Sequence, residues 1–308
     1  MQQNTGVTWL HFACPHCAGP LGPTLACANC GRDYTQREGI YRFLLPERHQ
    51  ALAPFLEQYR RVRDHDGYRS QRGAYYCALP AVPANDPQAA TWRLRAATFA
   101  TLLRQARLAP TQGSAGLNVL DLGAGNGWLS NRLSTLGHQC AAVDLLDDND
   151  DGLGAAQHYP THFARLQADF SRLPLMPGQF DRVVYNAALH YSADIQLSLR
   201  HGLSMLRPGG MLAILDSPSF RSKASAEQMV TSQAQRHQAA AGTLERPRPG
   251  QGYLLAGELI EIGSGLGLPL RYWPTRGSLA WSLRRRLASF KLRREAASFG
   301  LWLGVKPS

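Results

Sequence analysis

The sequence predicts an α/β protein with a doubly wound, seven-stranded, mostly parallel sheet and a small zinc ribbon at its N-terminus. Two observations carry this prediction. From about residue 91, apolar runs of strand length alternate with helical segments, as in a parallel sheet that is covered by helices on both faces. Near the N-terminus, two Cys-x2-Cys pairs fall within seventeen residues, which is a spacing typical of zinc sites.

Length, charge and hydropathy bound the class of protein. The chain has 308 residues, 44% of them hydrophobic, and a formal net charge of +11. It is long enough for one large domain with attachments. No apolar stretch approaches the roughly 18 residues of a membrane span, and the N-terminus has no basic-then-apolar signal. We therefore expect a cytoplasmic protein without a transmembrane segment.

The first element is the cysteine segment, which we expect to form a ribbon over residues 1–45. Cys14 and Cys17 are followed, after nine residues, by Cys27 and Cys30. Disulfides are the alternative, but a reducing cytosol would oppose them. Four thiolates on one zinc ion leave no open coordination position, so the predicted Zn²⁺ is structural. A segment this short cannot bury a useful core, and the metal would hold it folded.

The following elements place polar residues at the ends of strands. "LNVLDLG", "QCAAVDLL", "FARLQAD", "FDRVVYNAAL" and "GMLAILDS" are predicted strands with helices between most of them. In a parallel sheet, ligands bind beyond the carboxyl ends of the strands. Gly123, Asp144, Asp169 and the segment Asn186–Tyr191 lie at these ends.

The glycines after the first of these strands indicate a close approach of the main chain to a ligand. "VLDLGAGNGWLS", residues 119–130, has glycine at every second position from Gly123 to Gly127. The dinucleotide pattern G-x-G-x-x-G is not met, because Trp128 stands where its third glycine would be. The spacing D-x-G-x-G-x-G, which starts at Asp121, requires another explanation.

This set of motifs resembles the class I S-adenosylmethionine-dependent methyltransferases, type 11. The glycine turn matches their first motif and Asp144 the acid that ends their second strand. "LQADFSRLPL", "FDRVVYNAALHY" and "LRPGGMLAILD" match the later segments in family order, over roughly residues 91–220. The resemblance implies a Rossmann-like methyltransferase domain over 91–308 that binds S-adenosyl-L-methionine. It also implies that residues 46–90 form a helical linker that caps the cofactor.

The resemblance assigns roles to the residues at the strand ends. Asp144 would accept hydrogen bonds from the ribose hydroxyls, and Asp169 and Phe170 would contact the adenine. Asp121 would lie near the cationic amine, although it could instead cap or brace the turn, and Asp169 could instead cap a helix through Ser171. In related enzymes the preceding segments often close over the cofactor, which makes Tyr59, Arg63 and Arg93 candidates for its carboxylate. The expected cofactor-binding set is Asp121, Gly123, Ala124, Gly125, Gly127, Asp144, Leu145, Asp169, Phe170 and Asn186.

Methyl transfer is an in-line displacement that depends mainly on alignment and exclusion of water. A general base is needed only where the acceptor must lose a proton. His190 with Tyr191 is the best candidate for this catalytic role, and Asn186 could orient the acceptor. Alternatively, His190 packs against the helix that begins near Asp194.

The C-terminal third is less regular. A mostly polar helix that begins at Ser225 suggests a lid over 220–250. Residues 279–298 predict a basic helix with apolar positions on two sides, which would contact RNA, a membrane surface or another subunit, or would only be solvated. Residues 271–308 carry nine Lys and Arg against one Glu.

The sequence therefore predicts an enzyme, with its acceptor left open. Bacterial ribosomal RNA guanine methyltransferases look similar in their layout of zinc module and catalytic domain, which favours RNA as the acceptor. The alternative is a small hydrophobic metabolite such as a quinone precursor. An interpretation of another class is a zinc-ribbon protein that binds RNA or a partner and has a vestigial cofactor site.

Overall fold

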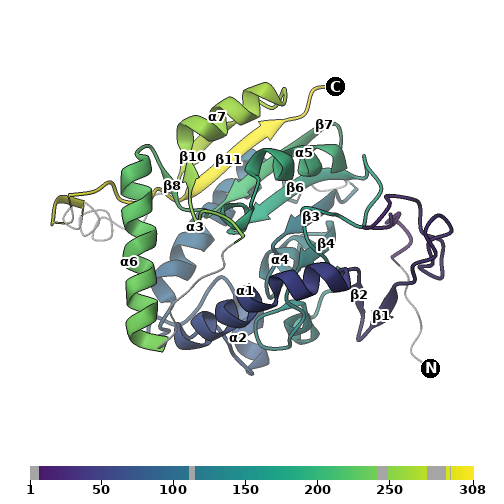
Figure 1. The fold of residues 1–308 in the computed structure, drawn as a ribbon, viewed down its shortest axis with the longest axis horizontal. Coiled ribbons are helices and arrows are strands. Elements are labelled where there is room, and N and C mark those ends of the chain that lie inside the picture. The colour runs from purple at the N-terminus through teal and green to yellow at the C-terminus, as the bar shows by residue number, and fades with distance from the viewer. Residues whose placement is uncertain (1–6, 111–114, 242–248, 276–288, 292) are drawn as a thin grey trace.

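The structure, a computed structural model, describes residues 7–110, 115–241, 249–275, 289–291 and 293–308. Figure 1 shows its elements. The strands are β1 Thr35–Arg37, β2 Ile40–Arg42, β3 Asn118–Leu122, β4 Gln139–Asp144, β5 Ala164–Gln167, β6 Phe180–Asn186, β7 Leu206–Leu215, β8 Ser219–Phe220, β9 Leu254–Leu255, β10 Arg271–Pro274 and β11 Gly300–Val305. The helices are α1 Pro46–His65, α2 Gly73–Ala78, α3 Ala89–Gln105, α4 Trp128–Thr135, α5 Ile195–Met205, α6 Lys223–Ala241 and α7 Ala256–Gly265, with 3₁₀ turns at Leu153–His158 and Leu189–Tyr191.

The central sheet has the order β1-β2-β5-β4-β3-β6-β7-β11-β10 among the described residues. Strands β2 to β7 in this order are parallel, and β11 and β10 run antiparallel to their neighbours β7 and β11. Seven of these strands, β5 to β10 in the same order, are the predicted doubly wound sheet. The hairpin β1–β2 of the cysteine segment extends that sheet through β5, so the sheet has nine strands instead of seven.

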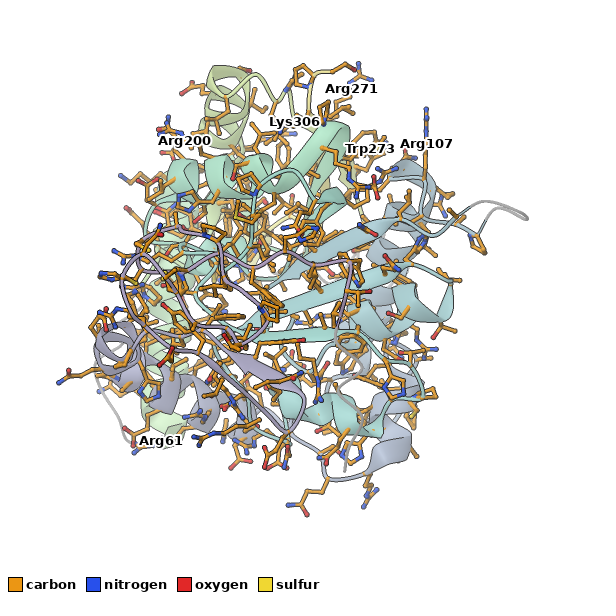
Figure 2. All side chains as sticks on the ribbon, turned by 90° about the vertical axis from the view of Figure 1, so that its right-hand side faces the viewer. Arg61, Arg107, Arg200, Arg271, Trp273 and Lys306 are labelled. Atoms are coloured by element: carbon orange, nitrogen blue, oxygen red, sulfur yellow. The ribbon has the colours of Figure 1, made fainter. Side chains whose placement is uncertain are left out.

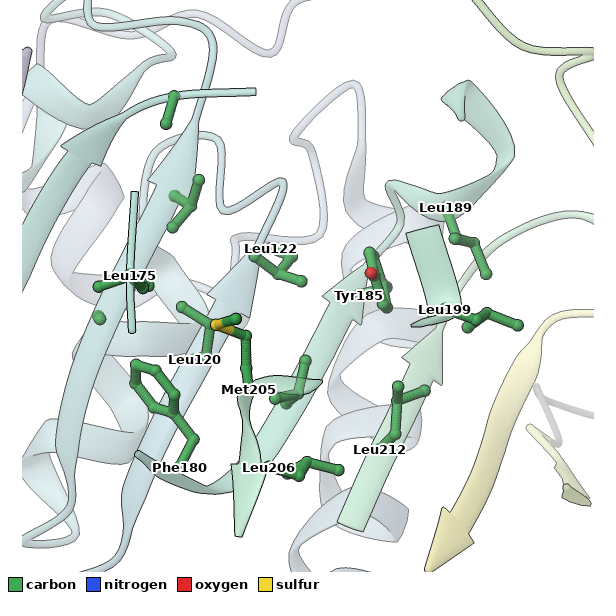
Figure 3. Packing of buried hydrophobic residues seen from close by; sticks show 14 of the residues in the cluster. Leu120, Leu122, Leu175, Phe180, Tyr185, Leu189, Leu199, Met205, Leu206 and Leu212 are labelled. Carbon is green, nitrogen blue, oxygen red and sulfur yellow. The ribbon is translucent and has the colours of Figure 1, made fainter. Parts of the chain in front are cut away.

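The alternation of side chains along the strands explains the layers. Leu120 and Leu122 of β3 face one hydrophobic cluster, and Val119 next to Leu120 faces the other. Helices α5 and α7 pack on the first face, where Leu199 and Leu259 are buried, and α3 and α4 cover the second. Figure 3 shows Leu120 and Leu122 of β3 in the first cluster, together with Tyr185, Leu199 and Met205. The predicted burial of the strands on both faces is confirmed.

Helix α1 connects the cysteine segment to the sheet. It starts with Pro46 in its first turn, where the missing N–H costs nothing. Its buried residues Leu52 and Leu56 pack against Leu146, which follows β4. This contact lays α1 over the carboxyl ends of the central strands (Figure 1).

The C-terminal third differs from the prediction at two points. Helix α6 begins at Lys223 and not at Ser225, because Ser222 Oγ accepts the hydrogen bond from the Ser225 N–H at 3.3 Å. The predicted basic helix 279–298 lies largely outside the described residues. Of its described residues, 289–291 are helical, whereas 293–298 are not, since Ser298 pairs with Ser219 and leads into β11. No helix among the described residues combines the length and apolarity needed to cross a membrane.

Candidate functional site

The turn after β3 is built from main chain. Gly123 and Gly125 have φ of +71° and +54°, in the left-handed region that favours glycine. A Cβ on Gly123 would lie 2.1 Å from Cβ of Ala188, so no side chain fits there. The Gly125 N–H donates to Asp144 Oδ2 at 2.7 Å. The turn is thereby tied to the end of the neighbouring strand β4, at the edge where the sequence predicts a ligand.

Asp144 is the acid of this site. Its Oδ1 accepts from the Leu146 N–H at 2.8 Å, so both carboxylate oxygens are oriented by backbone donors. Burial raises the pKa of Asp144 to about 6, and the two backbone donors oppose that rise. The group is a carboxylate at neutral pH, with lone pairs left for a ligand.

A cavity of about 400 Å³ lies over the turn and Asp144. Its floor is the sheet edge, and its cover is α1, which contributes Leu52, Phe55, Leu56 and Tyr59. The predicted site residues that line it are Gly123, Ala124, Gly125, Asp144, Leu145, Asp169, Phe170, Asn186 and Tyr191. Of the other predicted residues, Asp121 and Gly127 lie outside the lining, and His190 lines a neighbouring cavity.

Asp121 lies fully buried beneath the turn. Its Oδ2 accepts from the Ser130 hydroxyl at 2.9 Å, which fits the alternative role of bracing the turn. Its Oδ1 has no hydrogen-bond partner among the described residues. Burial raises the pKa of Asp121 to about 7. The unsatisfied oxygen leaves the group able to interact with a cation above it.

Asp169 has protein partners on both oxygens. Oδ1 accepts from the Ser171 N–H at 2.8 Å, and Oδ2 forms an ion pair with Arg48 of α1. The bond to Ser171 is therefore present, but the residues after Asp169 form a turn and not the helix that the alternative role required. Asp169 nevertheless faces the cavity beside Phe170.

The residues after β6 divide between two cavities. Asn186 is buried, and its Oδ1 has no hydrogen-bond partner among the described residues. The His190 ring lies 3.1 Å from the Ser217 hydroxyl through Nδ1 and packs against Tyr191, with ring centroids 4.2 Å apart. Tyr191 lines both cavities.

Two of the three capping candidates, Tyr59 and Arg63, line the cavity. Arg63, however, is paired with Asp151 at 2.5 and 2.8 Å. Arg93 is exposed and lines neither cavity. Arg95, one turn apart from the buried Trp92, lines both cavities and has no ion pair or hydrogen bond among the described residues.

The acidic loop after β4 has a role that sequence reasoning missed. From its composition alone, "LLDDNDDG" is predicted to be a hydrated loop without a chemical role. Instead, its acids pair with arginines of the N-terminal segment: Arg42 with Asp147, Arg60 and Arg69 with Asp148, Arg69 with Asp150, and Arg63 with Asp151. The loop therefore fastens α1 over the cavity. The sequence did contain a signal for this pairing, namely several arginines between residues 42 and 69 and a run of acidic residues within 147–151.

The four cysteines of the N-terminal segment come together. Their sulfur atoms all lie within 4.8 Å of one another, and none is in a disulfide. The Cys14 and Cys30 sulfurs are 3.6 Å apart, and those of Cys17 and Cys27 are 3.5 Å apart. Zn–S bonds of about 2.3 Å in a tetrahedron require S···S distances of about 3.8 Å. The cluster therefore has the size of a zinc site with four cysteine ligands.

Fold and site together define a class. A doubly wound sheet carries, at the carboxyl ends of its central strands, a glycine turn, an acid that ends the second strand of the domain and a covered cavity. This is the arrangement of a nucleoside-cofactor domain.

Comparisons with known proteins specify that class. Residues 120–214 match the family described as methyltransferase domain. The malonyl-[acyl-carrier protein] O-methyltransferase of Erwinia pyrifoliae is 31% identical over 116 residues, which cover 37% of this chain and 43% of that protein. The ubiquinone/menaquinone biosynthesis C-methyltransferase UbiE of Blochmanniella floridana is 36% identical over 109 residues, which cover 33% of this chain and 42% of that protein. This chain thus spans less than half the length of these two relatives.

Solved structures agree on the fold. A candidate sarcosine dimethylglycine methyltransferase from Galdieria sulphuraria has a TM-score of 0.53 at 15% identity, over 82% of this chain and 98% of that one. Residues 120–214 therefore match a methyltransferase domain, and the chain shares the fold of a solved protein of that kind.

Proposed function

We propose that the protein transfers the methyl group of S-adenosylmethionine to a small, largely apolar acceptor. The observation that carries this proposal is the covered cavity of about 400 Å³ between α1 and the turn after β3, a size within the range of small-molecule sites. When bound, S-adenosylmethionine supplies an activated methyl group on a sulfonium sulfur. The main contribution of this chain is to position the reacting groups.

The residues of the cavity fit the cofactor group by group. Asp144, held by two backbone donors, would accept from the ribose hydroxyls, and the bare main chain at Gly123 and Gly125 admits the amino acid portion. The unsatisfied Asp121 Oδ1 beneath the turn suits the positive amine. Phe170 offers a ring face to the adenine, with Asp169 beside it.

Arg95 would bind the cofactor's carboxylate. Arg95 lines the cavity, and its guanidinium carbon lies 4.8 Å from the Trp92 ring and 5.9 Å from the Tyr68 ring, with no ion pair or hydrogen bond among the described residues. Arg63 is already committed to Asp151, so we assign the carboxylate to Arg95 instead of to the candidates of the sequence. Burial strengthens a charge pair of this kind relative to one in water.

The acceptor is the finer part of the proposal. A second cavity adjoins the one assigned to the cofactor, and its lining includes the apolar side chains Leu94, Met229 and Phe299, which suits a metabolite better than a polynucleotide. The relatives above are named for malonyl-[acyl-carrier protein] and for quinones, and they lend RNA no support. In the view of Figure 2, the described residues Arg61, Arg107, Arg200 and Arg271 are spread over several elements.

The cysteine cluster would hold one structural Zn²⁺ on Cys14, Cys17, Cys27 and Cys30. Four thiolates saturate the ion, so it would take no part in methyl transfer. Its effect would be mechanical, because the hairpin β1–β2 joins the sheet and leads directly into α1. We expect about one zinc per chain by elemental analysis of the purified protein.

Calorimetry with S-adenosylhomocysteine tests the cofactor site. We expect one saturable site in the wild type and an affinity at least 50-fold lower for Asp144→Ala, because the ribose would lose its acceptor. Glu261→Ala, an exposed acid of α7, is the matched control and should bind like the wild type. If the wild type does not bind S-adenosylhomocysteine at millimolar concentration, the enzyme interpretation fails. The interpretation that would remain is a binding protein with a vestigial cofactor site.

Label transfer identifies the acceptor class. The protein is incubated with methyl-labelled cofactor and cell extract, and the extract is then separated into RNA, protein and small molecules. We expect label in the small-molecule fraction. Label in RNA that is sensitive to ribonuclease would overturn the proposed acceptor class while leaving the methyltransferase activity intact.

A further inference from the structure

A second cavity, of about 630 Å³, adjoins the cofactor cavity. Its walls come from α1, α3, the ends of β6 and β7, and α6, which contributes Met229 and Gln233. The predicted lid segment therefore forms one of its walls. The two cavities share the lining residues Phe55, Tyr59, Arg63, Arg95, Ala187 and Tyr191.

This arrangement suits a second ligand next to the first. Ala187 follows β6 directly at the boundary between the cavities, so a molecule in the second cavity can reach one in the first there. The boundary side chains Phe55, Tyr59 and Tyr191 are aromatic, and their rings pack at centroid distances of 5.8 Å. Leu94, Met229 and Phe299 extend the apolar surface deeper into the second cavity.

Asp216, which follows β7, is the buried carboxylate of the second cavity. The residue is 8% exposed, and its backbone is left-handed, with φ of +49°. Oδ1 accepts from the Thr98 hydroxyl at 2.7 Å, and Thr98 lies 2.6 Å from the Thr275 hydroxyl. Oδ2 takes part in no hydrogen bond among the described residues. A buried oxygen left open in this way is a candidate acceptor for a ligand's donor.

We infer that the second cavity binds the methyl acceptor and that Asp216 accepts the proton from the acceptor's nucleophilic atom. This inference rests on the proposed function. The ligand class is an aromatic or otherwise apolar molecule with one O–H or N–H group, because the walls are apolar and the open polar atom is a hydrogen-bond acceptor. Asp216 is thus assigned as a catalytic residue in the role predicted for His190, whose Nδ1 lies against Ser217.

The transfer balances with the groups present. The lone pair of the acceptor's oxygen or nitrogen forms the bond to the methyl carbon, and the electrons of the S–C bond remain on sulfur, which becomes a thioether. The acceptor's proton passes to Asp216 Oδ2 and then to solvent. Burial raises the pKa of Asp216 to about 6, and the Thr98 hydroxyl and the charge of Arg95 oppose that rise. The group therefore rests as a carboxylate at neutral pH and is close enough to neutrality to take a proton.

The test uses 4-nitrophenol as an apolar aryl hydroxyl, bound to protein loaded with S-adenosylhomocysteine. Titration calorimetry should show one saturable site. Leu94→Trp fills the second cavity without touching the first and should weaken nitrophenol binding at least tenfold. Ala100→Trp, at an exposed position of the same helix, is the matched control and should bind like the wild type.

The absorbance of bound 4-nitrophenol reports on Asp216. A carboxylate next to the hydroxyl disfavours the phenolate, so the pKa of the bound phenol should be higher in the wild type than in Asp216→Asn. Asn keeps the shape and tolerates the left-handed backbone, so the variant is expected to fold.

The outcomes separate two failures. If S-adenosylhomocysteine does not bind to the wild type, the proposed function fails. If it binds but nitrophenol does not saturate, or Leu94→Trp binds it normally, the acceptor site is wrong. An equal phenol pKa in wild type and Asp216→Asn would remove Asp216 from its role.

Discussion

The two sides of the cofactor cavity are held together by different forces. The floor is main chain: the glycine turn is fixed by left-handed φ values and by a backbone bond to Asp144. The cover is α1, and it is held by side chains that pair with acids far along the sequence, such as Arg63 with Asp151. The floor therefore fixes which cofactor fits, while the cover fixes how tightly the cavity closes. Perturbing each side in turn should give effects of different size.

The largest effect is expected at the floor. Gly123→Val would place Cβ 2.1 Å from Ala188 and force a β-branched residue to a φ of +71°. We expect the affinity for S-adenosylhomocysteine, measured by calorimetry, to fall at least 100-fold. The control is Gly257→Val in α7, whose Cβ would meet open space. Unchanged affinity in Gly123→Val would show that the turn does not contact the cofactor.

The pH dependence of binding tests the acids of the floor. The pKa of Asp144 is about 6 and that of Asp121 about 7, both raised by burial. In the proposed complex, the ionised Asp144 would accept from the ribose and the ionised Asp121 would face the amine, so cofactor affinity should fall as the pH falls through these values. We expect at least a tenfold loss between pH 8 and pH 5. Asp144→Asn should bind S-adenosylhomocysteine more weakly than the wild type and should lose less affinity between pH 8 and pH 5. A pH profile identical to that of the wild type would exclude Asp144 from cofactor binding.

The same acids affect stability in the opposite sense. The native pKa values lie above the value of 3.8 for an unperturbed Asp, so the folded protein holds more protons than the unfolded one between about pH 4 and pH 7. The free energy of unfolding of the cofactor-free protein should therefore decrease as the pH rises through this window. Asp121→Asn should make the decrease shallower in urea denaturation. A steeper decrease would contradict the assignment.

A smaller effect on cofactor binding is expected at the buried end of the cover. Arg63→Met leaves the Asp151 carboxylate, which is 4% exposed, without its partner. Loss of one partner of a buried pair costs about 3 kcal/mol of stability, by the usual range for such pairs. We expect cofactor affinity to fall about fivefold, because α1 closes less well. Adding Asp151→Asn should recover most of the lost stability in thermal unfolding.

The smallest effect is expected at the exposed end of the cover. The Arg69 side chain is 23% exposed, and its acids Asp148 and Asp150 are similarly open. Partly exposed pairs are worth about 1 kcal/mol or less. Arg69→Met should change cofactor affinity no more than twofold, and a loss as large as that of Arg63→Met would mean that the cover is a single cooperative network.

The floor and a helical cover over residues 46–90 were predictable from sequence, but the ion pairs that hold the cover in place were not, for a physical reason. The turn, Asp144 and the strands are local patterns of a few residues, which carry their own backbone requirements. The pairs of the cover join residues such as Arg63 and Asp151, 88 positions apart, and no periodicity links them. The same holds for the pairing of β2 with β5, which made the sheet wider than predicted.

Every proposal above requires that the glycine turn and Asp144 hold a sulfonium nucleoside. A crystal structure with S-adenosylhomocysteine measures this directly. We expect both ribose hydroxyls within hydrogen-bond distance of Asp144, the adenine against Phe170 and the amino acid portion over Gly123. A ligand found elsewhere, or a ribose that does not touch Asp144, would contradict this assignment.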